Sequence, residues 1–280
     1  MTPWRYLFTL SRPRFWFYLA GPVLVAAAYG AGRPADLLDG RLVACFLYCL
    51  LPANVLLYGV NDRYDQEVDA ANPKKEDREA RFREGRATSW ALALSAALSL
   101  ALLWALPAGA RGWLAGFLVL AWGYSAPPLR FKARPLWDSL SNGLYILPGV
   151  AAYVLLRGEA PPAAAILAGW LWTMAMHSFS AIPDIVPDRA AGIATTATWL
   201  GVRGTYAYCF FCWLGAALAM GRVAWPLGLL LGLYPVLVAL IAWRGLDVHR
   251  AYWWFPAINT AVGMALTLAG LARLVGAAAG

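Results

Sequence analysis

The chain has 280 residues, of which 61% are hydrophobic and only 14% are charged, and its formal net charge is +8. A soluble domain usually carries about 25% charged residues, so this composition excludes both a disordered chain and an ordinary soluble domain. Four cysteines are too few for a disulfide-stapled fold. We therefore predict one integral membrane domain over residues 1–280. We attribute the positive charge to cytoplasmic loops and expect no nucleic acid as a partner.

Apolar stretches long enough to cross a membrane recur along the whole chain. A spanning helix needs about 20 apolar residues. Prolines interrupt some stretches, as at Pro22, Pro52 and Pro148, which a bundle tolerates where neighbouring groups satisfy the freed carbonyls. The predicted fold is all-α, with about nine transmembrane helices in one bundle. The predicted helices lie near 15–31, 41–60, 89–108, 112–126, 139–156, 163–183, 204–221, 224–243 and 251–275.

The basic residues are distributed unequally between alternate loops. With nine spans, most of the 23 lysines and arginines fall on the same face as the N-terminus. Because cytoplasmic loops carry the excess of positive charge, we predict a cytoplasmic N-terminus and a C-terminus outside, in the cytoplasmic membrane. The first ten residues lack the pattern of a cleaved signal peptide, so we expect no segment to be removed.

The first group of acids lies at the cytoplasmic end of the second predicted helix. If that helix continues, Asp62, Asp65 and Asp69 share one face, next to Asn61. Like charges in such a stripe repel each other unless cations neutralise them. A few carboxylates with open coordination positions suit Mg²⁺ that also binds phosphate oxygens. The alternative is a solvated helix end with Arg63 as a counter-ion, and the motif favours Mg²⁺.

The second group of acids lies at the cytoplasmic end of the sixth predicted helix. Asp184 and Asp188 are four residues apart, so a helix places both carboxylates on one face. Two such groups at the same membrane depth, one in each half of the chain, are able to hold a diphosphate between Mg²⁺ ions. The two aspartate motifs together support Mg²⁺ binding more strongly than either motif does alone.

A cationic loop follows the fourth predicted helix. Pro127 and Pro128 end that helix, and Arg130, Lys132 and Arg134 follow within a few residues. By itself this segment is as typical of a loop that stops membrane insertion as of a loop that binds phosphate. Beside two acidic motifs, its cations become candidates to bind phosphate oxygens and to neutralise a leaving diphosphate.

Three motifs together resemble the UbiA superfamily of intramembrane prenyltransferases. They are Asn-Asp-x-x-Asp-x-x-x-Asp on the second helix, Tyr-Ser-x-Pro-Pro-x-x-x-Lys after the fourth and Asp-x-x-x-Asp after the sixth. The resemblance covers almost the whole chain and implies nine helices around a central cavity, with the active-site mouth on the cytoplasmic face. It assigns Mg²⁺ binding to Asn61, Asp62, Asp65, Asp69, Asp184 and Asp188. It assigns binding of the isoprenoid diphosphate to Lys132 and to Arg63, Arg130 and Arg134.

Finer features resemble the lycopene elongase group within this superfamily. They lie at 11–16, 72–75 and 177–184. Asn72-Pro73 replaces the usual Arg-Thr stretch, which weakens a quinone-pathway interpretation, and Gly192 stands where some members have a third acid. The resemblance implies transfer of a dimethylallyl group from dimethylallyl diphosphate to the ends of lycopene, sometimes with hydration. The expected partners are this diphosphate, a lipophilic acceptor and membrane lipid.

Three residues are candidates for catalysis near the cytoplasmic mouth. Asp138 and His177 are candidates for the final proton transfer or for positioning water, and Tyr124, which begins the loop motif, is a third candidate. A lone histidine at a helix end is more often a structural group, so its role stays open. His249 lies in a loop and has no evident role.

Two other functions compete with carotenoid elongation. One is prenyl transfer to an aromatic or quinone-precursor acceptor within the same superfamily. The other is membrane transport, since transporters also place acids within a helix bundle. The acids here gather at one surface instead of the midplane, and no inverted repeat stands out, which argues against transport.

Overall fold

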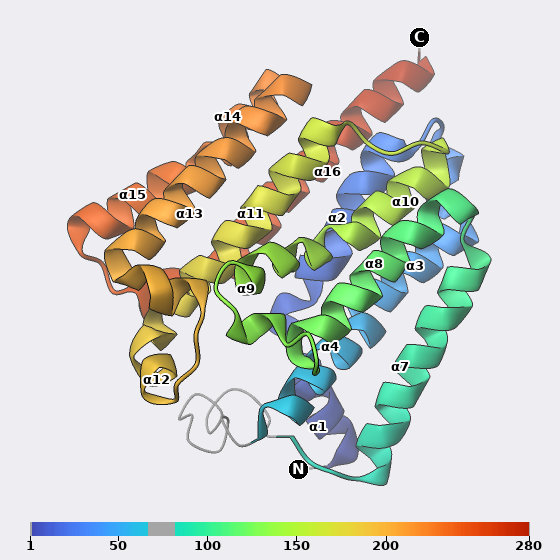
Figure 1. The fold of residues 1–280 in the computed structure, drawn as a ribbon. Coiled ribbons are helices and arrows are strands. Elements are labelled where there is room, and N and C mark those ends of the chain that lie inside the picture. The colour runs from blue at the N-terminus through green and yellow to red at the C-terminus, as the bar shows by residue number, and fades with distance from the viewer. Residues whose placement is uncertain (1, 67–81, 280) are drawn as a thin grey trace. The chain divides into compact units, whose positions relative to one another are not determined.

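A computed structural model describes residues 2–66 and 82–279, and every regular element within these residues is helical (Figure 1). The predicted all-α class is therefore confirmed for the described part of the chain. The helices group into two compact units. The first unit comprises Met1–Leu129, Leu147–Glu159 and Thr267–Gly280, and the second comprises Arg130–Ile146 and Ala160–Leu266.

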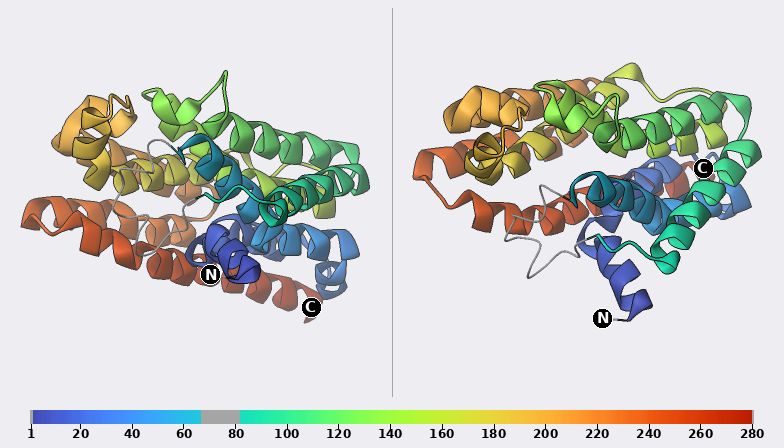
Figure 2. Two further views of the ribbon diagram at one scale, coloured as in Figure 1. Left: turned by 90° about the horizontal axis from the view of Figure 1, so that it is seen from below. Right: turned by 60° about the horizontal axis from the view of Figure 1, so that its bottom comes forward.

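In the first unit, α10 packs against α2 and α8, and α4 packs against α7 (Figure 1). The short helix α1, dark blue beside the N-terminal mark in both views of Figure 2, packs against α4 and α7. The elements of this unit are α1 (Pro3–Leu10), η1 (Pro13–Phe15), α2 (Trp16–Gly30), η2 (Pro34–Leu38), α3 (Gly40–Leu50), α4 (Pro52–Tyr64), α7 (Arg86–Ala105), α8 (Ala108–Ser125), α10 (Leu147–Arg157) and the end of α16 (Val248–Ala279).

In the second unit, α11 packs along α13, and α13 also contacts α12, α14 and α15. An aromatic core lies among these helices: Phe179 and Phe255 have ring centroids 4.7 Å apart, and Trp213 stacks on Tyr234 at 5.5 Å. The elements are η3 (Phe131–Ala133), α9 (Trp137–Leu140), η4 (Ser141–Tyr145), α11 (Ala163–Ala181), η5 (Ile182–Asp184), α12 (Ile185–Ala190), α13 (Thr196–Val223), α14 (Trp225–Leu231), α15 (Leu233–Arg244) and the start of α16.

All nine predicted windows fall on helical segments. Within the described residues, seven helical segments are long and apolar enough to cross a membrane, so the chain is an integral membrane protein. Helices α2 and α8 are not among these seven. With 15 residues, α2 extends about 22 Å, which is less than the hydrocarbon thickness of about 30 Å. The count of nine spans and the positions of the termini remain predictions.

Several predicted helices are interrupted. The window 41–60 divides into α3 and α4 at Leu51, because Pro52 has no amide hydrogen with which to continue the helix. The window 139–156 contains η4 and α10 instead of one helix, and 224–243 divides into α14 and α15 at Gly232. Gly201 adopts a left-handed φ of 68°, which separates the first turn of α13 from the rest of that helix.

Helices α2 and α10 approach each other closely at one glycine. A Cβ atom added to Gly149 on α10 would lie 2.7 Å from the carbonyl oxygen of Pro22 and 2.9 Å from its Cβ. Because backbone atoms cannot move aside as a flexible side chain does, this position requires a residue without a side chain. At Gly21, the residue before Pro22, an added Cβ would meet nothing within 4 Å.

Gly149→Ala is expected to destabilise the protein by about 1–3 kcal/mol, because the extra methyl group forces α2 and α10 apart. Gly21→Ala is the matched control, and its better helix propensity is expected to stabilise the protein by up to about 1 kcal/mol. Thermal unfolding in detergent micelles measures both changes. Equal unfolding midpoints for the two variants would contradict the close approach.

Candidate active site

The first aspartate motif contains a buried carboxylate near the end of α4. Asp62 is 1% exposed, and the Arg12 guanidinium lies 2.9 Å from its Oδ1. The same guanidinium lies over the ring of Tyr58, 4.5 Å from its centroid, one turn earlier on α4. Arg12 therefore compensates the charge of Asp62 although the two residues are 50 positions apart. We did not identify Arg12 as a site residue from the sequence.

The backbone at Arg12 directs this contact. Arg12 lies between α1 and η1 and adopts a left-handed conformation with φ 49° and ψ 70°, which is uncommon for a residue with a Cβ atom. Pro13 then starts η1, and the indole of Trp16 donates to the Ser11 carbonyl at 3.1 Å. The turn is thus fixed on both sides of Arg12. The signal in the sequence was an arginine directly before a proline at a helix end.

Two of the predicted motifs meet within the first unit. Asn61 Nδ2 lies 3.4 Å from Asp62 Oδ1, and the Ser125 hydroxyl donates to Asn61 Oδ1 at 2.9 Å. Ser125 is the last residue of α8 and follows Tyr124, so the start of the loop motif lies against the first aspartate motif. This contact fixes the Asn61 amide so that one of its oxygen lone pairs is already engaged.

The common face expected for Asp62, Asp65 and Asp69 depended on the second helix continuing through them, and this condition is not met at Asp65. Helix α4 ends at Tyr64, and Asp65 has φ −109° and ψ 5°. Carboxylates at the negative end of a helix dipole are unfavourable, which accounts for the end of the helix among these acids. Arg63 is exposed and Asp65 is partly buried. Asp69 lies outside the described residues.

The predicted cationic loop belongs to the second unit. Lys132 lies in η3 and is partly buried, whereas Arg130 and Arg134 on either side of η3 are exposed. The loop is held at its end, where the Leu136 amide donates to Thr196 Oγ1 at 2.8 Å. Two of the three cations therefore reach the surface from a segment whose position is fixed by the start of α13.

The second aspartate motif forms one continuous helical turn. Asp184 ends η5 and precedes α12, which contains Asp188. Both aspartates are partly buried while Val186, between them, is exposed, which agrees with the predicted common face. Arg189 anchors this turn, because its Nη2 donates to the Thr198 carbonyl at 2.6 Å. The motif is therefore tied to the first turn of α13.

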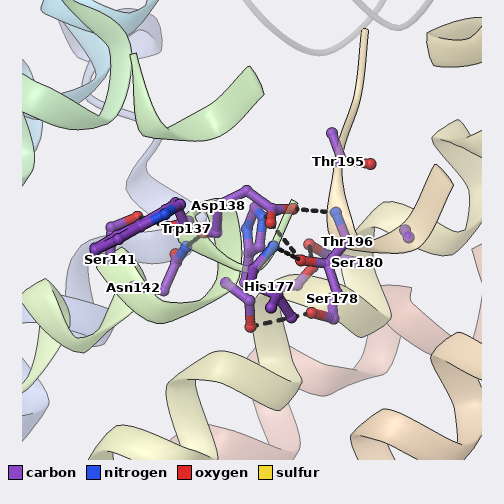
Figure 3. Close-up of polar contacts among 12 residues, drawn as sticks. Trp137, Asp138, Ser141, Asn142, His177, Ser178, Ser180, Thr195 and Thr196 are labelled. Atoms are coloured by element: carbon purple, nitrogen blue, oxygen red, sulfur yellow. Dashed lines mark hydrogen bonds and ion pairs between the residues drawn. The ribbon is translucent and has the colours of Figure 1, made fainter. Parts of the chain in front are cut away.

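Asp138 is a second buried carboxylate, 1% exposed, and it is bonded to the same turn of α13 (Figure 3). Its Oδ2 accepts the Thr196 amide at 2.9 Å, and its Oδ1 accepts the Thr196 hydroxyl. Because Thr196 is the first residue of α13, the carboxylate interacts with the positive end of the helix dipole. His177 Nε2 lies 3.6 Å from Oδ2. The structure thus brings together Asp138 and His177, two candidates that were predicted separately.

Buried hydroxyl groups fix α9 against α11 and α13 around this pair. Ser139 donates to the Met174 carbonyl at 3.1 Å and lies 2.9 Å from the Tyr208 hydroxyl. Ser178, next to His177, donates to Ser139 at 3.2 Å. Such satisfied polar groups hold neighbouring side chains in one arrangement. Ser139, Tyr208 and Thr196 were not identified from the sequence.

The candidate metal ligands do not form a dense acidic cluster in the described part of the chain. No group of three His, Cys, Asp or Glu side chains within residues 2–66 and 82–279 lies close enough to hold a metal ion. The oxygen donors instead occur as a neighbouring pair on α4, Asn61 and Asp62, and as a pair on one turn, Asp184 and Asp188.

A helical membrane protein with two aspartate motifs and a cationic loop at helix ends has the features of an intramembrane prenyltransferase. The UbiA prenyltransferase family matches residues 18–275, and the chain belongs to this family. A lycopene elongase/hydratase from Haloferax volcanii is 57% identical over 270 residues, which cover 96% of this chain and 90% of that protein. Another from Halobacterium salinarum is 55% identical, covering 95% and 97%. The protein is therefore a prenyltransferase, and its resemblance to the lycopene elongase group is confirmed.

Solved structures of the family share the fold. A UbiA homologue from Archaeoglobus fulgidus, bound to DMAPP and Mg²⁺, has a TM-score of 0.72 at 21% identity, covering 95% of this chain and 99% of that one. The apo structure of a homologue from Aeropyrum pernix has a TM-score of 0.69 at 19% identity, covering 91% and 96%.

Arg12→Met is expected to destabilise the protein by about 3–5 kcal/mol, because it removes the cation beside a buried carboxylate. Adding Asp62→Asn to this variant should restore much of the loss, since the buried charge is then also removed. Arg14→Met is the matched control at an exposed arginine, with an expected change below about 0.5 kcal/mol. Denaturant unfolding in detergent measures all three, and equal stability of the Arg12 and Arg14 variants would refute a stabilising ion pair.

Proposed function

We propose that this prenyltransferase transfers a dimethylallyl group from dimethylallyl diphosphate to the ends of lycopene or a related carotenoid and adds water to the product. The observation that carries this proposal is the identity above 50% to lycopene elongase/hydratases along nearly the whole chain. The two aspartate motifs and the cationic loop supply groups suited to a diphosphate donor.

The residues of the first motif fit Mg²⁺. This ion binds proteins through one or two carboxylates and keeps waters and substrate phosphate oxygens as its other ligands, so a dense acidic cluster is unnecessary. Asn61 and Asp62 are neighbours on α4 and each carries a side-chain oxygen, and Asp65 and Asp69 follow them in the sequence. In the second motif, Asp184 and Asp188 are the proposed ligands. Bound Mg²⁺ would neutralise negative charge on the departing diphosphate.

Side chains of the chain itself are proposed to hold the donor. Arg130, Lys132 and Arg134 would bind diphosphate oxygens from the loop that Thr196 anchors. Arg63, exposed beside Asp62 on α4, is also proposed to bind diphosphate oxygens. Tyr124 is proposed to contact the reacting atoms, because it lies directly before Ser125, which donates to Asn61.

The carbon chemistry follows from these assignments. The bond between the allylic carbon and the diphosphate oxygen breaks, and the electron pair of the terminal double bond of the acceptor forms the new carbon–carbon bond. A tertiary cation remains on the acceptor and takes water or loses a proton. A dry and apolar surrounding protects this cation, and ring faces stabilise it.

We further propose that the protein lies in the cytoplasmic membrane with nine spans. Its N-terminus would then be cytoplasmic and its C-terminus external. The excess of basic residues in loops on the N-terminal side supports this orientation. Both aspartate motifs and the cationic loop then lie toward the cytoplasmic face, where a water-soluble diphosphate is available.

Purified protein incubated with Mg²⁺, lycopene and dimethylallyl diphosphate is expected to yield acceptors larger by one or two five-carbon units, detected by mass spectrometry. Excess EDTA should abolish the products. Asp62→Asn and Asp184→Asn should each lower turnover by about 100-fold or more, because each removes a charge that binds and balances the metal–diphosphate complex. Asp247→Asn, at an exposed aspartate before α16, is the matched control and should retain activity.

Two results would change this assignment. Pyrophosphate release with an aromatic acceptor but not with lycopene would retain the metal and diphosphate residues and assign the acceptor to a phenol-like ring. Full turnover in both the Asp62 and Asp184 variants would refute the proposed metal ligands.

A further inference from the structure

The second unit holds a histidine beside a buried carboxylate that the metal and diphosphate assignments do not use. His177 Nε2 lies 3.6 Å from Asp138 Oδ2, with the His177 side chain 17% exposed and Asp138 1% exposed (Figure 3). The sequence contains one other histidine, His249, which is exposed in the first turn of α16. His177 is thus the histidine that the fold places at the end of α11 among buried polar groups.

This pairing gives the imidazole a defined direction. Nε2 is the ring nitrogen that faces the carboxylate, so the carboxylate favours the neutral tautomer with its proton on Nε2 and its lone pair on Nδ1. When Nδ1 accepts a proton, the nearby carboxylate compensates the positive charge on the ring, as in other histidine–carboxylate pairs. Asp138 itself is less suited to take the proton, because Thr196 donates to both of its oxygens.

The position of His177 on its helix suits a reaction near the diphosphate. His177 precedes Asp184 by seven residues, and the intervening chain through Ile182 keeps right-handed helical backbone angles. Four steps along α11 and three along η5 make about two helical turns, so both side chains project on a similar face about 12 Å apart along the axis. With the donor diphosphate at Asp184, as proposed above, and its apolar chain directed toward the membrane interior, the reacting carbons lie on the His177 side of that motif.

We infer that His177 is the catalytic residue that accepts the proton from water during hydration, and that Asp138 is its positioning residue. The water oxygen donates an electron pair to the tertiary carbon of the acceptor and forms a carbon–oxygen bond. The bond between that oxygen and one hydrogen breaks, and the proton moves to His177 Nδ1. The products are a hydroxylated, elongated carotenoid and pyrophosphate. This inference rests on the proposed function.

The test is the ratio of hydrated to unhydrated product within the elongated carotenoid. His177→Gln is expected to lower that ratio at least about tenfold, because general base catalysis is lost, while elongation continues. Water enriched in heavy oxygen labels the hydroxyl group, so mass spectrometry reports hydration and elongation in one sample. His249→Gln is the matched control and should leave the ratio as in the unaltered protein.

Two further variants separate proton transfer from the anchoring of α13. Thr196→Val removes the hydroxyl that donates to Asp138 Oδ1, but the amide of residue 196 still donates to Oδ2, the oxygen that faces His177. This variant should therefore lower the unfolding temperature without changing the product ratio. Asp138→Asn removes the charge beside the imidazole and should shift the ratio in the same direction as His177→Gln. Because the ratio is taken within the elongated product, a smaller amount of folded protein does not alter it.

The outcomes distinguish a role of His177 in proton transfer from a purely structural role. An unchanged ratio in His177→Gln, or an equal shift in Thr196→Val, would overturn the role of His177 in proton transfer. Elongated but unhydrated carotenoid from the unaltered protein would overturn it too and would leave the proposed prenyl transfer standing. Absence of any elongated product from the unaltered protein would refute the proposed function and the inference with it.

Discussion

A carboxylate in the low-dielectric interior of a membrane protein requires a partner inside the protein, and this requirement determines the surroundings of one candidate residue in each unit. Asp62 and Asp138 are each 1% exposed. Arg12 approaches Asp62 from the turn between α1 and η1, and this contact connects the N-terminal segment to α4. Asp138 instead accepts the amide and hydroxyl of Thr196, which connects α9 to the first turn of α13. Each buried acid thus holds together segments that are distant in sequence.

Local patterns made the helices and the motifs predictable. Apolar length predicted the helical segments, and the spacing of Asp184 and Asp188 predicted a common face, because both properties depend on residues within a few turns. The partners of the buried acids were not predictable in this way. Arg12 pairs with Asp62 across 50 positions, and only the packing of α1 on α4 determines that contact. His177 and Asp138 were both candidates, but their contact depends on the packing of α9 on α11.

The end of α4 before Asp65 could not be predicted for a related reason. Residue spacing indicates which positions share a face if a helix continues, but it does not determine where the helix ends. Helix α4 ends at Tyr64, among acids that oppose the dipole at its C-terminus. The second motif differs because Arg189 fixes α12 to the Thr198 carbonyl. A local spacing rule was therefore reliable where a tertiary contact stabilised the helical turn.

The two buried acids also differ in how easily they can exchange partners. The partner of Asp62 is a flexible arginine side chain that is itself 16% exposed, so the guanidinium can move without disrupting a helix. The partner of Asp138 includes a backbone amide at the start of α13, so releasing this carboxylate would leave a buried amide unsatisfied. A metal ligand must exchange partners during each cycle, whereas a positioning residue must keep them. By this criterion Asp62 is suited to bind a substrate-linked cation, and Asp138 is suited to hold His177.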